Sequence, residues 1–506
     1  MRIFFLVLLS VVFRWPVLSH AKSLHSDAAI VGLQTRHMLA GEWAPFLHGS
    51  GYQSSTDAIF ALPWFALFGS DPWVLLSSTL ALHIAFTLCV DAVLRNAGLS
   101  RWRSFLLCLA LVFTPPPIHT YALYPPRQAA ITIAGFAMLA AAKSRGPRMI
   151  ALSCVLAGAA VYADPYAQVF VPAVFVLLAA RATTRSWSGL GAAAAGSLVG
   201  ACLPYWLRHR ADASNGPMGF GFEPWRIERA AKLLRTECGP WITSAKAYVP
   251  AVFEGHQPWP APSWFGFVQT LGATTLVIGA LSAGVLLFVR SVKWPLRAAG
   301  LAGLAVWGLT TAAFFVSVMV MDLYSTRYLA ALVLTAPLAL APLAAWMQSR
   351  TALLPWGAYL SAAAVAGWLG FAPLVSGFTL TEHPSGRGID EDALLKACKE
   401  HQVQAVMTDY WAAYRLAFLW KEQVVAMPPT AHEDRYARYR EVYARAEHVA
   451  YVYDPARSRE KPGEAAALAA AQGVVSSSSQ IGSFTVWWID KPVGKVAVEK
   501  VDATMR

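Results

Sequence analysis

Long apolar runs recur along this chain, and they constrain its fold more than any other feature. A stretch that crosses a bilayer needs about 20 mostly apolar residues, because lipid offers no hydrogen-bond partner to the backbone. Charged residues make up only 14% of the 506 residues, against about 25% in an ordinary soluble domain, and the shortfall is concentrated in the runs. The pattern predicts a helical membrane protein with about 11 spans, at 3–19, 73–94, 104–121, 128–142, 149–163, 167–180, 187–207, 264–289, 298–321, 328–347 and 352–378.

Basic residues are distributed unevenly between alternate loops. One set of short loops holds twelve of them, whereas the other set holds only Arg127 and Arg327. Such an excess marks the cytoplasmic side of a membrane protein, so the net charge of +12 does not predict nucleic-acid binding. We expect a cytoplasmic N-terminus, with the loops at 20–72 and 208–263 and the C-terminal tail outside. The twelve are Arg95, Arg101, Arg103, Lys143, Arg145, Arg148, Arg181, Arg185, Arg290, Lys293, Arg297 and Arg350.

The first apolar run has two interpretations. Residues 1–21 resemble a signal peptide, because Arg2 precedes an apolar stretch that ends at Ser19-His20-Ala21. Arg14 interrupts that stretch, which favours a span that is retained. Cleavage would leave the topology of the remaining spans unchanged.

The outer loops carry helical patterns of their own. Ser26 or Asp27 can cap a helix that stops at Gly41, and the apolar stretch 58–68 is too short to span comfortably. In the second long loop, residues 226–235 follow the spacing of an amphipathic helix with basic side chains on its polar faces. That segment is either a helix resting on anionic headgroups or one that helps to bind a lipid phosphate.

Beyond residue 380 the sequence changes character, and helical patterns alternate with short strand patterns. This alternation is typical of a small α/β domain. The predicted division is therefore a membrane domain over 1–379 and an extracytoplasmic α/β domain over 380–506. The helical patterns lie at 390–400, 410–420, 433–446 and 464–472, and the strand patterns at 404–407, 423–427, 448–453 and 484–489.

Polar side chains gather where the spans meet the outer face. Acids at such positions are costly unless they are paired or hydrated, so they are candidates for a site. Each also has a structural interpretation: Asp27 as a helix cap, Asp164 as a turn residue before Pro165, and the arginines as side chains that extend to headgroups. The candidates are Asp27, Asp57, Tyr124, Arg127, Asp164, Arg327 and Tyr328.

The order of several short motifs resembles the GT-C superfamily of membrane glycosyltransferases, which includes protein O-mannosyltransferases and the aminoarabinose transferases of lipid A modification. The resemblance extends over most of the chain. It rests on Ser26-Asp27-Ala28-Ala29-Ile30-Val31-Gly32-Leu33, Arg36-His37-Met38-Leu39-Ala40-Gly41-Glu42, the stretch from Tyr52 through Asp57 to Gly69, Tyr124-Pro125, Arg327-Tyr328-Leu329, and the segment Thr408 to Leu416. Ala28 follows Asp27 where the family usually carries a second acid.

The resemblance implies an inverting glycosyltransferase of a bacterial inner membrane that uses a polyprenyl-phosphate sugar donor. Asp27 would be the base that activates an acceptor hydroxyl, or a ligand to a divalent metal ion, whose requirement stays open. Arg327, Arg127 and Arg36 would bind the donor phosphate, with Arg327 as the first candidate. Asp57, Tyr124, Asp164 and Tyr328 would line the substrate pocket. The acceptor is an unknown lipid, glycan or protein.

Two other functions stay open at this point. One is a transporter or flippase for lipid-linked sugars, although transporters usually carry charges at mid-membrane rather than at one face. The other is a catalytically inactive scaffold of the same fold, because Ala28 replaces the second acid. Transfer of a labelled sugar separates the enzyme from both.

Overall fold

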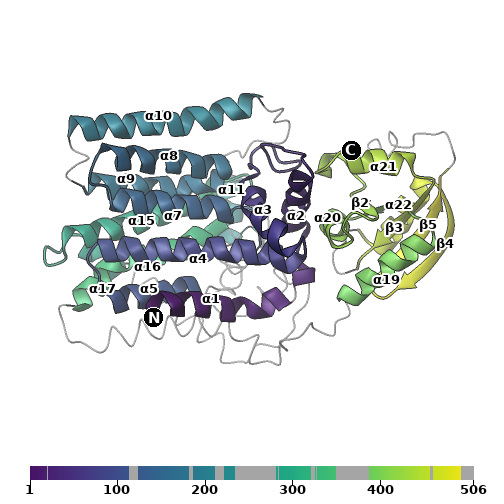
Figure 1. Ribbon diagram of the computed structural model, residues 1–506, viewed down its shortest axis with the longest axis horizontal. Coiled ribbons are helices and arrows are strands. Elements are labelled where there is room, and N and C mark those ends of the chain that lie inside the picture. Colours follow the sequence, from purple (N-terminus) through teal and green to yellow (C-terminus); the bar gives the residue numbers. More distant parts are fainter. Residues whose placement is uncertain are drawn as a thin grey trace.

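The computed structural model describes residues 1–19, 21–112, 124–181, 186–210, 222–233, 281–282, 284–320, 325, 328–348, 387–455, 458 and 460–491. Long helices lie side by side in a bundle on one side of the molecule, and an α/β unit occupies the other side (Figure 1). Helices α2 and α3 lie between the two (Figure 1). The bundle contains α1 (Arg2–Ser19), α4 (Pro72–Asn96), α5 (Arg101–Val112), α7 (Gln128–Ala142), α8 (Pro147–Ala163), η2 (Pro165–Phe170), α9 (Val171–Ala179), α10 (Trp187–Arg210), α11 (Pro224–Lys232), α15 (Trp294–Val316), α16 (Ala330–Ala339) and α17 (Ala341–Gln348).

Most of the predicted spans coincide with helices of the bundle, but the predicted count of about 11 is not confirmed. Within the described residues, α4 and α15 are long and apolar enough to cross a membrane, and several shorter apolar helices accompany them. The predicted span at 352–378 and most of the span at 264–289 lie outside the described residues. Proline at the first or second position of α4, α8 and α15 suits their starts, because proline has no N–H to satisfy there.

Small residues allow the helices of the bundle to approach closely. A Cβ atom added at Gly158 of α8 would lie 2.2 Å from the carbonyl oxygen of Gly200 in α10. Likewise, a Cβ at Gly303 of α15 would lie 2.3 Å from the backbone nitrogen of Ala339 in α16. Such contacts are typical of helices that associate in membranes, where apolar burial alone does not drive association.

Arg14, the charged residue within the apolar run of α1, holds this helix inside the bundle. The Arg14 guanidinium is fully buried, and it donates to the carbonyl oxygens of Leu111 at 3.1 Å and Val112 at 3.0 Å, at the end of α5. Its Nη2 also lies 3.0 Å from Nε2 of His83 in α4. The residue that interrupts the first apolar run therefore joins three helices.

The opposite end of α1 is also anchored. Arg2 forms an ion pair with the buried carboxylate of Asp91 at 3.5 Å, and Arg95 reaches the same carboxylate at 2.9 Å. Ser104 donates to Asp91 Oδ1 at 2.5 Å. Asp91 thus binds one arginine of α1 and one of α4, and a serine of α5.

The first long loop folds into η1 (Ala21–Ser23), α2 (Ser26–Leu39) and α3 (Thr56–Phe68). The cap of α2 differs from the prediction. His25 is the N-cap residue, and its Nδ1 accepts from the backbone N–H of Ala28 at 3.2 Å. Neither Ser26 nor Asp27 caps the helix, because both side chains bind Tyr410 of the α/β unit instead.

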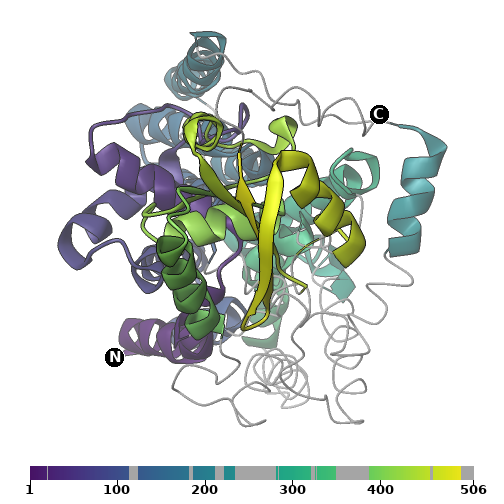
Figure 2. The ribbon, with the colours of Figure 1, turned by 90° about the vertical axis from the view of Figure 1, so that its right-hand side faces the viewer.

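The α/β unit is built on a five-stranded sheet in the order β2-β1-β3-β5-β4. Strands β1, β2 and β3 are parallel, and β5 runs antiparallel to both β3 and β4. Figure 2 shows the sheet with α19 and α22 beside it. The elements are α19 (Arg387–Glu400), β1 (Ala405–Thr408), α20 (Tyr410–Leu419), β2 (Val425–Met427), η7 (Ala431–Glu433), α21 (Arg438–Arg445), β3 (His448–Tyr453), α22 (Pro462–Gln472), β4 (Val474–Ile481) and β5 (Phe484–Asp490).

The α/β unit and the first long loop share one hydrophobic core. Buried residues of α2, α3 and the start of α4 belong to the same cluster as those of β1, α20 and β3. Gly32 of α2 is part of this contact, because a Cβ there would lie 2.5 Å from the ring of Phe418 in α20. The predicted domain boundary at 379/380 lies outside the described residues.

Candidate functional site

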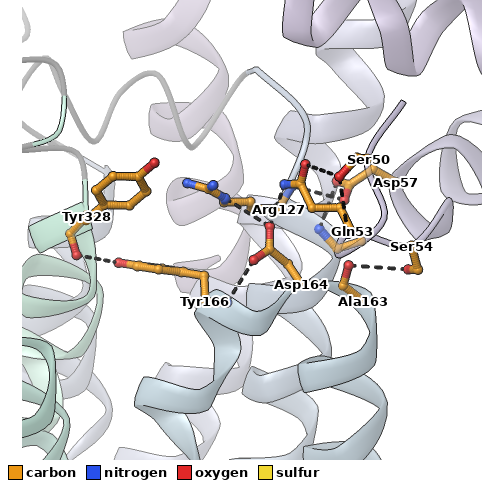
Figure 3. A network of polar contacts seen from close by, with 10 residues as sticks. Ser50, Gln53, Ser54, Asp57, Arg127, Ala163, Asp164, Tyr166 and Tyr328 are labelled. Carbon is orange, nitrogen blue, oxygen red and sulfur yellow. Dashed lines mark hydrogen bonds and ion pairs between the residues drawn. The ribbon is translucent and has the colours of Figure 1, made fainter. Parts of the chain in front are cut away.

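A buried ion pair joins the start of α7 to the turn between α8 and η2 (Figure 3). Arg127 Nε donates to Asp164 Oδ2 at 2.9 Å, and both side chains are at least 92% buried. Gln53 of the first long loop donates to the same oxygen at 2.7 Å. Asp164 Oδ1 accepts from the backbone N–H of Tyr166 at 2.8 Å. Asp164 therefore serves both as a turn residue and as the counter-ion of Arg127.

Asp57 positions Arg127 through its backbone. Both oxygens of this buried carboxylate accept at 3.0 Å from backbone N–H groups at the start of α7, those of Arg127 and Ala129. Arg127 has φ +101°, a conformation that costs a non-glycine residue about 1–3 kcal/mol and persists only where neighbours impose it. Burial raises the pKa of Asp57 to about 6, although the two backbone hydrogen bonds act to lower it. Near neutral pH Asp57 is therefore in its ionised form, in which both oxygens can accept the two backbone hydrogen bonds.

Two tyrosines line the other side of the Arg127 guanidinium (Figure 3). The guanidinium carbon lies 5.0 Å from the ring centroid of Tyr328 and 5.8 Å from that of Tyr166. The Tyr166 hydroxyl donates to the carbonyl oxygen of Tyr328 at 3.1 Å and accepts from the backbone N–H of Ala331 at 2.9 Å. The start of α16 is thereby tied to Arg127 and η2.

Asp27 lies at the contact between the membrane bundle and the α/β unit. Its Oδ1 accepts from the Tyr410 hydroxyl at 2.5 Å. The charges of both clusters act on Tyr52. Burial raises the pKa of Tyr52, Arg127 lowers it, and Asp164, Tyr328 and Asp27 raise it.

The remaining predicted residues are distributed differently. The Tyr124 ring packs 5.2 Å from the ring of His25, the cap of the helix that carries Asp27. Arg36 does not join Arg127: its guanidinium donates to Ser70 Oγ and to the Ser70 carbonyl oxygen, both at 2.8 Å, and stacks 4.2 Å from the Phe418 ring. Arg327 lies outside the described residues.

Sequence reasoning missed Tyr410 and Arg435, which the α/β unit brings to Asp27. Arg435 Nε donates to the Tyr410 hydroxyl oxygen at 3.2 Å. The motif segment Thr408 to Leu416 contains Tyr410 and was the available signal. Arg435 is one of several arginines in a polar segment and carries no comparable signal.

Among the described residues, the side chains around Asp27 do not form a set of ligands for a divalent cation. Within the described part of the chain, no three His, Cys, Asp or Glu side chains gather as metal ligands. Ala28, the residue after Asp27, offers no ligand, and Oδ1 of Asp27 already accepts a hydrogen bond. Among the described residues, Arg127 pairs with Asp164 and Arg435 contacts the Tyr410 hydroxyl, so both bring positive charge to these clusters.

The structural neighbours of this chain include a bacterial ArnT and an archaeal oligosaccharyltransferase. The fold is similar to that of ArnT from Cupriavidus metallidurans in the apo state, at 13% identity and a TM-score of 0.47, with 96% of this chain and 97% of that chain covered. The same protein bound to undecaprenyl phosphate gives a TM-score of 0.46 at the same identity and coverage. The apo oligosaccharyltransferase of Archaeoglobus fulgidus gives 0.40 at 11% identity, with 84% of this chain and 64% of that chain covered. No protein-family model and no curated protein matches the chain.

Proposed function

We propose that this protein is a multi-pass membrane glycosyltransferase that moves a sugar from a polyprenyl phosphate to an acceptor hydroxyl. The observation that carries the proposal is the presence of these charged groups beside an apolar bundle. A half-buried carboxylate, Asp27, and the buried Arg127–Asp164 pair both act electrostatically on Tyr52. A lipid-linked donor would enter from the bundle, and an acceptor would enter from outside it.

In the proposed reaction, Asp27 takes the proton of the acceptor hydroxyl as the oxygen attacks the anomeric carbon. A bond forms between that oxygen and the sugar, and the bond between the sugar and the phosphate breaks. Polyprenyl phosphate leaves with the electron pair. Attack on the face opposite the leaving group would invert the anomeric centre.

The departing phosphate gains negative charge, and arginine stabilises it because its planar guanidinium can donate two parallel hydrogen bonds. Arg127 is the described candidate, and Arg327 is the candidate outside the described residues. Two tyrosine rings beside Arg127 and the Asp57 bonds to its backbone hold it in place. Asp57, Tyr124, Asp164 and Tyr328 would line or support the pocket.

We further propose that the site faces the outside of a bacterial inner membrane, with the N-terminus in the cytoplasm and residues 380–506 outside. The excess of basic residues in alternate loops supports this orientation. A reporter fused after Arg506 should be active only outside the cytoplasm. Activity of that reporter in the cytoplasm would overturn the orientation.

The test of the function is transfer by the purified full-length protein in proteoliposomes. It is supplied with a panel of radiolabelled polyprenyl-phosphate sugars, and label is followed into acceptor or into slow hydrolysis product. Asp27→Asn should abolish turnover with expression and thermal unfolding unchanged, whereas Asp71→Asn, a half-exposed acid paired with Lys421, should not. Full activity of Asp27→Asn would remove Asp27 from the mechanism. Absence of any turnover by the wild type would overturn the function.

A further inference from the structure

The α/β unit contributes a side chain to the membrane-side candidate site. Tyr410 is the first residue of α20, and Asp409 caps that helix by accepting from the backbone N–H of Trp411 at 2.8 Å. The start of α20 meets the start of α2, where Ser26 Oγ donates to the Tyr410 carbonyl oxygen at 2.6 Å. This contact holds the Tyr410 ring over α2. Its hydroxyl then reaches Asp27 Oδ1 at 2.5 Å.

Arg435 sets the direction of that hydrogen bond. A phenol has one proton to donate, and its oxygen can also accept. Arg435 Nε donates to the Tyr410 oxygen at 3.2 Å, so the single phenolic proton is left for Asp27. Arg435 is itself fixed, because its Nη1 donates to the carbonyl oxygen of Gly49 at 2.6 Å. From Arg435 to Tyr410 to Asp27, each hydrogen bond is therefore donated in the direction of Asp27.

Arg435 can approach the loop at Gly49 closely because glycine has no side chain. Gly49 has φ +62°, and a Cβ atom there would lie 2.5 Å from Cα of Arg435. A side chain at position 49 would thus be strained and would also displace Arg435. The first long loop and the α/β unit fit at this point through a backbone contact that needs glycine.

Charges at the junction reinforce the arrangement. Burial raises the pKa of Tyr410, and Asp27 raises it further, so the phenol keeps its proton. Burial acts to lower the pKa of Arg435, but Tyr410, Asp27 and Tyr52 raise it overall. A hydrogen bond donated to a carboxylate favours its charged form.

We propose that Tyr410, held by Arg435, is a positioning residue that fixes the Asp27 carboxylate in its ionised form, so that the α/β unit completes the catalytic site. The inference rests on the proposed function, in which Asp27 is the base. Tyr410 acts through Asp27 and need not touch the substrate.

The test is Tyr410→Phe in the full-length protein. We expect kcat to fall by about tenfold to a hundredfold, because a loosely held base spends less time in reach of the hydroxyl. Loss of a hydrogen bond donated to a carboxylate disfavours its charged form, so the acidic limb of the kcat profile should move to higher pH. KM for the donor should stay the same. Arg435→Gln should move the limb in the same direction by a smaller amount.

The matched control is Tyr443→Phe, which removes a hydroxyl from the same unit. Tyr443 is equally buried, but its hydroxyl lies 3.1 Å from Gln472 Oε1 and not at the site. This variant should keep the kcat and pH profile of the wild type. Thermal unfolding of every variant reports whether a loss of activity comes from loss of fold.

The outcomes separate this inference from the function on which it rests. If the wild type turns over, Asp27→Asn is inactive and Tyr410→Phe keeps both kcat and the acidic limb, then Tyr410 does not position the base. If Tyr410→Phe and Tyr443→Phe lower kcat equally without moving the limb, the effect of Tyr410 is structural and the inference is overturned. A wild type without turnover overturns the function, and the role of Tyr410 with it.

Discussion

The backbone N–H of Arg127 donates to Asp57 at 3.0 Å, while the guanidinium of the same residue donates to Asp164 at 2.9 Å. One buried acid therefore fixes the backbone of the arginine, and a second fixes its side chain. The two acids come from the first long loop and from the end of α8, so the position of Arg127 depends on how these segments pack.

Asp57→Asn should lower the free energy of unfolding by about 1–3 kcal/mol, because asparagine keeps one acceptor oxygen and leaves one N–H of α7 without a partner. Chemical unfolding in detergent measures the change. Asp71→Asn is the control: its pair with Lys421 is about half exposed, and such pairs contribute about 0–1 kcal/mol. Equal losses of unfolding free energy in the two variants would contradict the conclusion that Asp57 stabilises the start of α7 through these two hydrogen bonds.

Arg127→Gln should lower the free energy of unfolding by about 3–5 kcal/mol, because it leaves the buried Asp164 carboxylate without its cation. Adding Asp164→Asn to that variant removes the unpaired charge and should restore most of the stability. Sugar transfer should remain lost in the double variant, because the cation proposed to bind the phosphate is absent. A double variant that transfers sugar would remove Arg127 from the phosphate site.

The junction between the first long loop and the α/β unit should weaken in acid. Burial, reinforced by His37, lowers the pKa of His48 from 6.5 to about 4. The unfolded chain binds a proton at His48 below pH 6.5 while the folded chain does not, so the stability present above pH 6.5 is lost as the pH falls towards 4. Between pH 7.5 and 5.0 the loss amounts to about 2 kcal/mol.

His48→Gln should remove that part of the pH dependence. The measurement compares unfolding of the two proteins at pH 7.5 and 5.0, where the variant should lose less stability than the wild type. An unchanged difference between the two pH values would show that His48 titrates normally in the fold.

Helix α1 should remain part of the mature protein, because Arg14 supplies donors to two carbonyl oxygens at the end of α5 and contacts His83. Intact mass should include residues 1–19. Arg14→Leu should lower the midpoint of thermal unfolding, whereas Arg101→Leu should change it little, since Arg101 is exposed. A mature protein that begins near residue 22 would show that α1 is cleaved.

Much of the architecture could be predicted from hydropathy and from the change of pattern beyond residue 380. The helices at 128–142 and 390–400 were predicted closely, because their limits are set by local spacing. Strand β4 was missed, since its serine-rich sequence lies exposed at an edge and gains its structure only by pairing with β5.

The candidate site was predictable where its residues sit near the ends of spans, as Asp164 and Arg127 do, or in a motif of the first long loop, as Asp57 does. The partners of Asp27 could not be found this way, because Tyr410 and Arg435 lie more than 380 residues along the chain. Only docking of the α/β unit brings them together. The cap of α2 was assigned wrongly for the same reason, since Tyr410 engages the side chains that could otherwise have capped the helix.

The Phe418 ring fills the space that a side chain at position 32 would need, since a Cβ there would lie 2.5 Å from the ring. Changes at these two positions should therefore compensate each other: a larger residue at 32 becomes tolerable when 418 is smaller. Among natural variants of this chain the two positions should covary in size although they are far apart in sequence. The helix that carries Asp27 and the α/β unit that contacts it would then be inherited as a matched set.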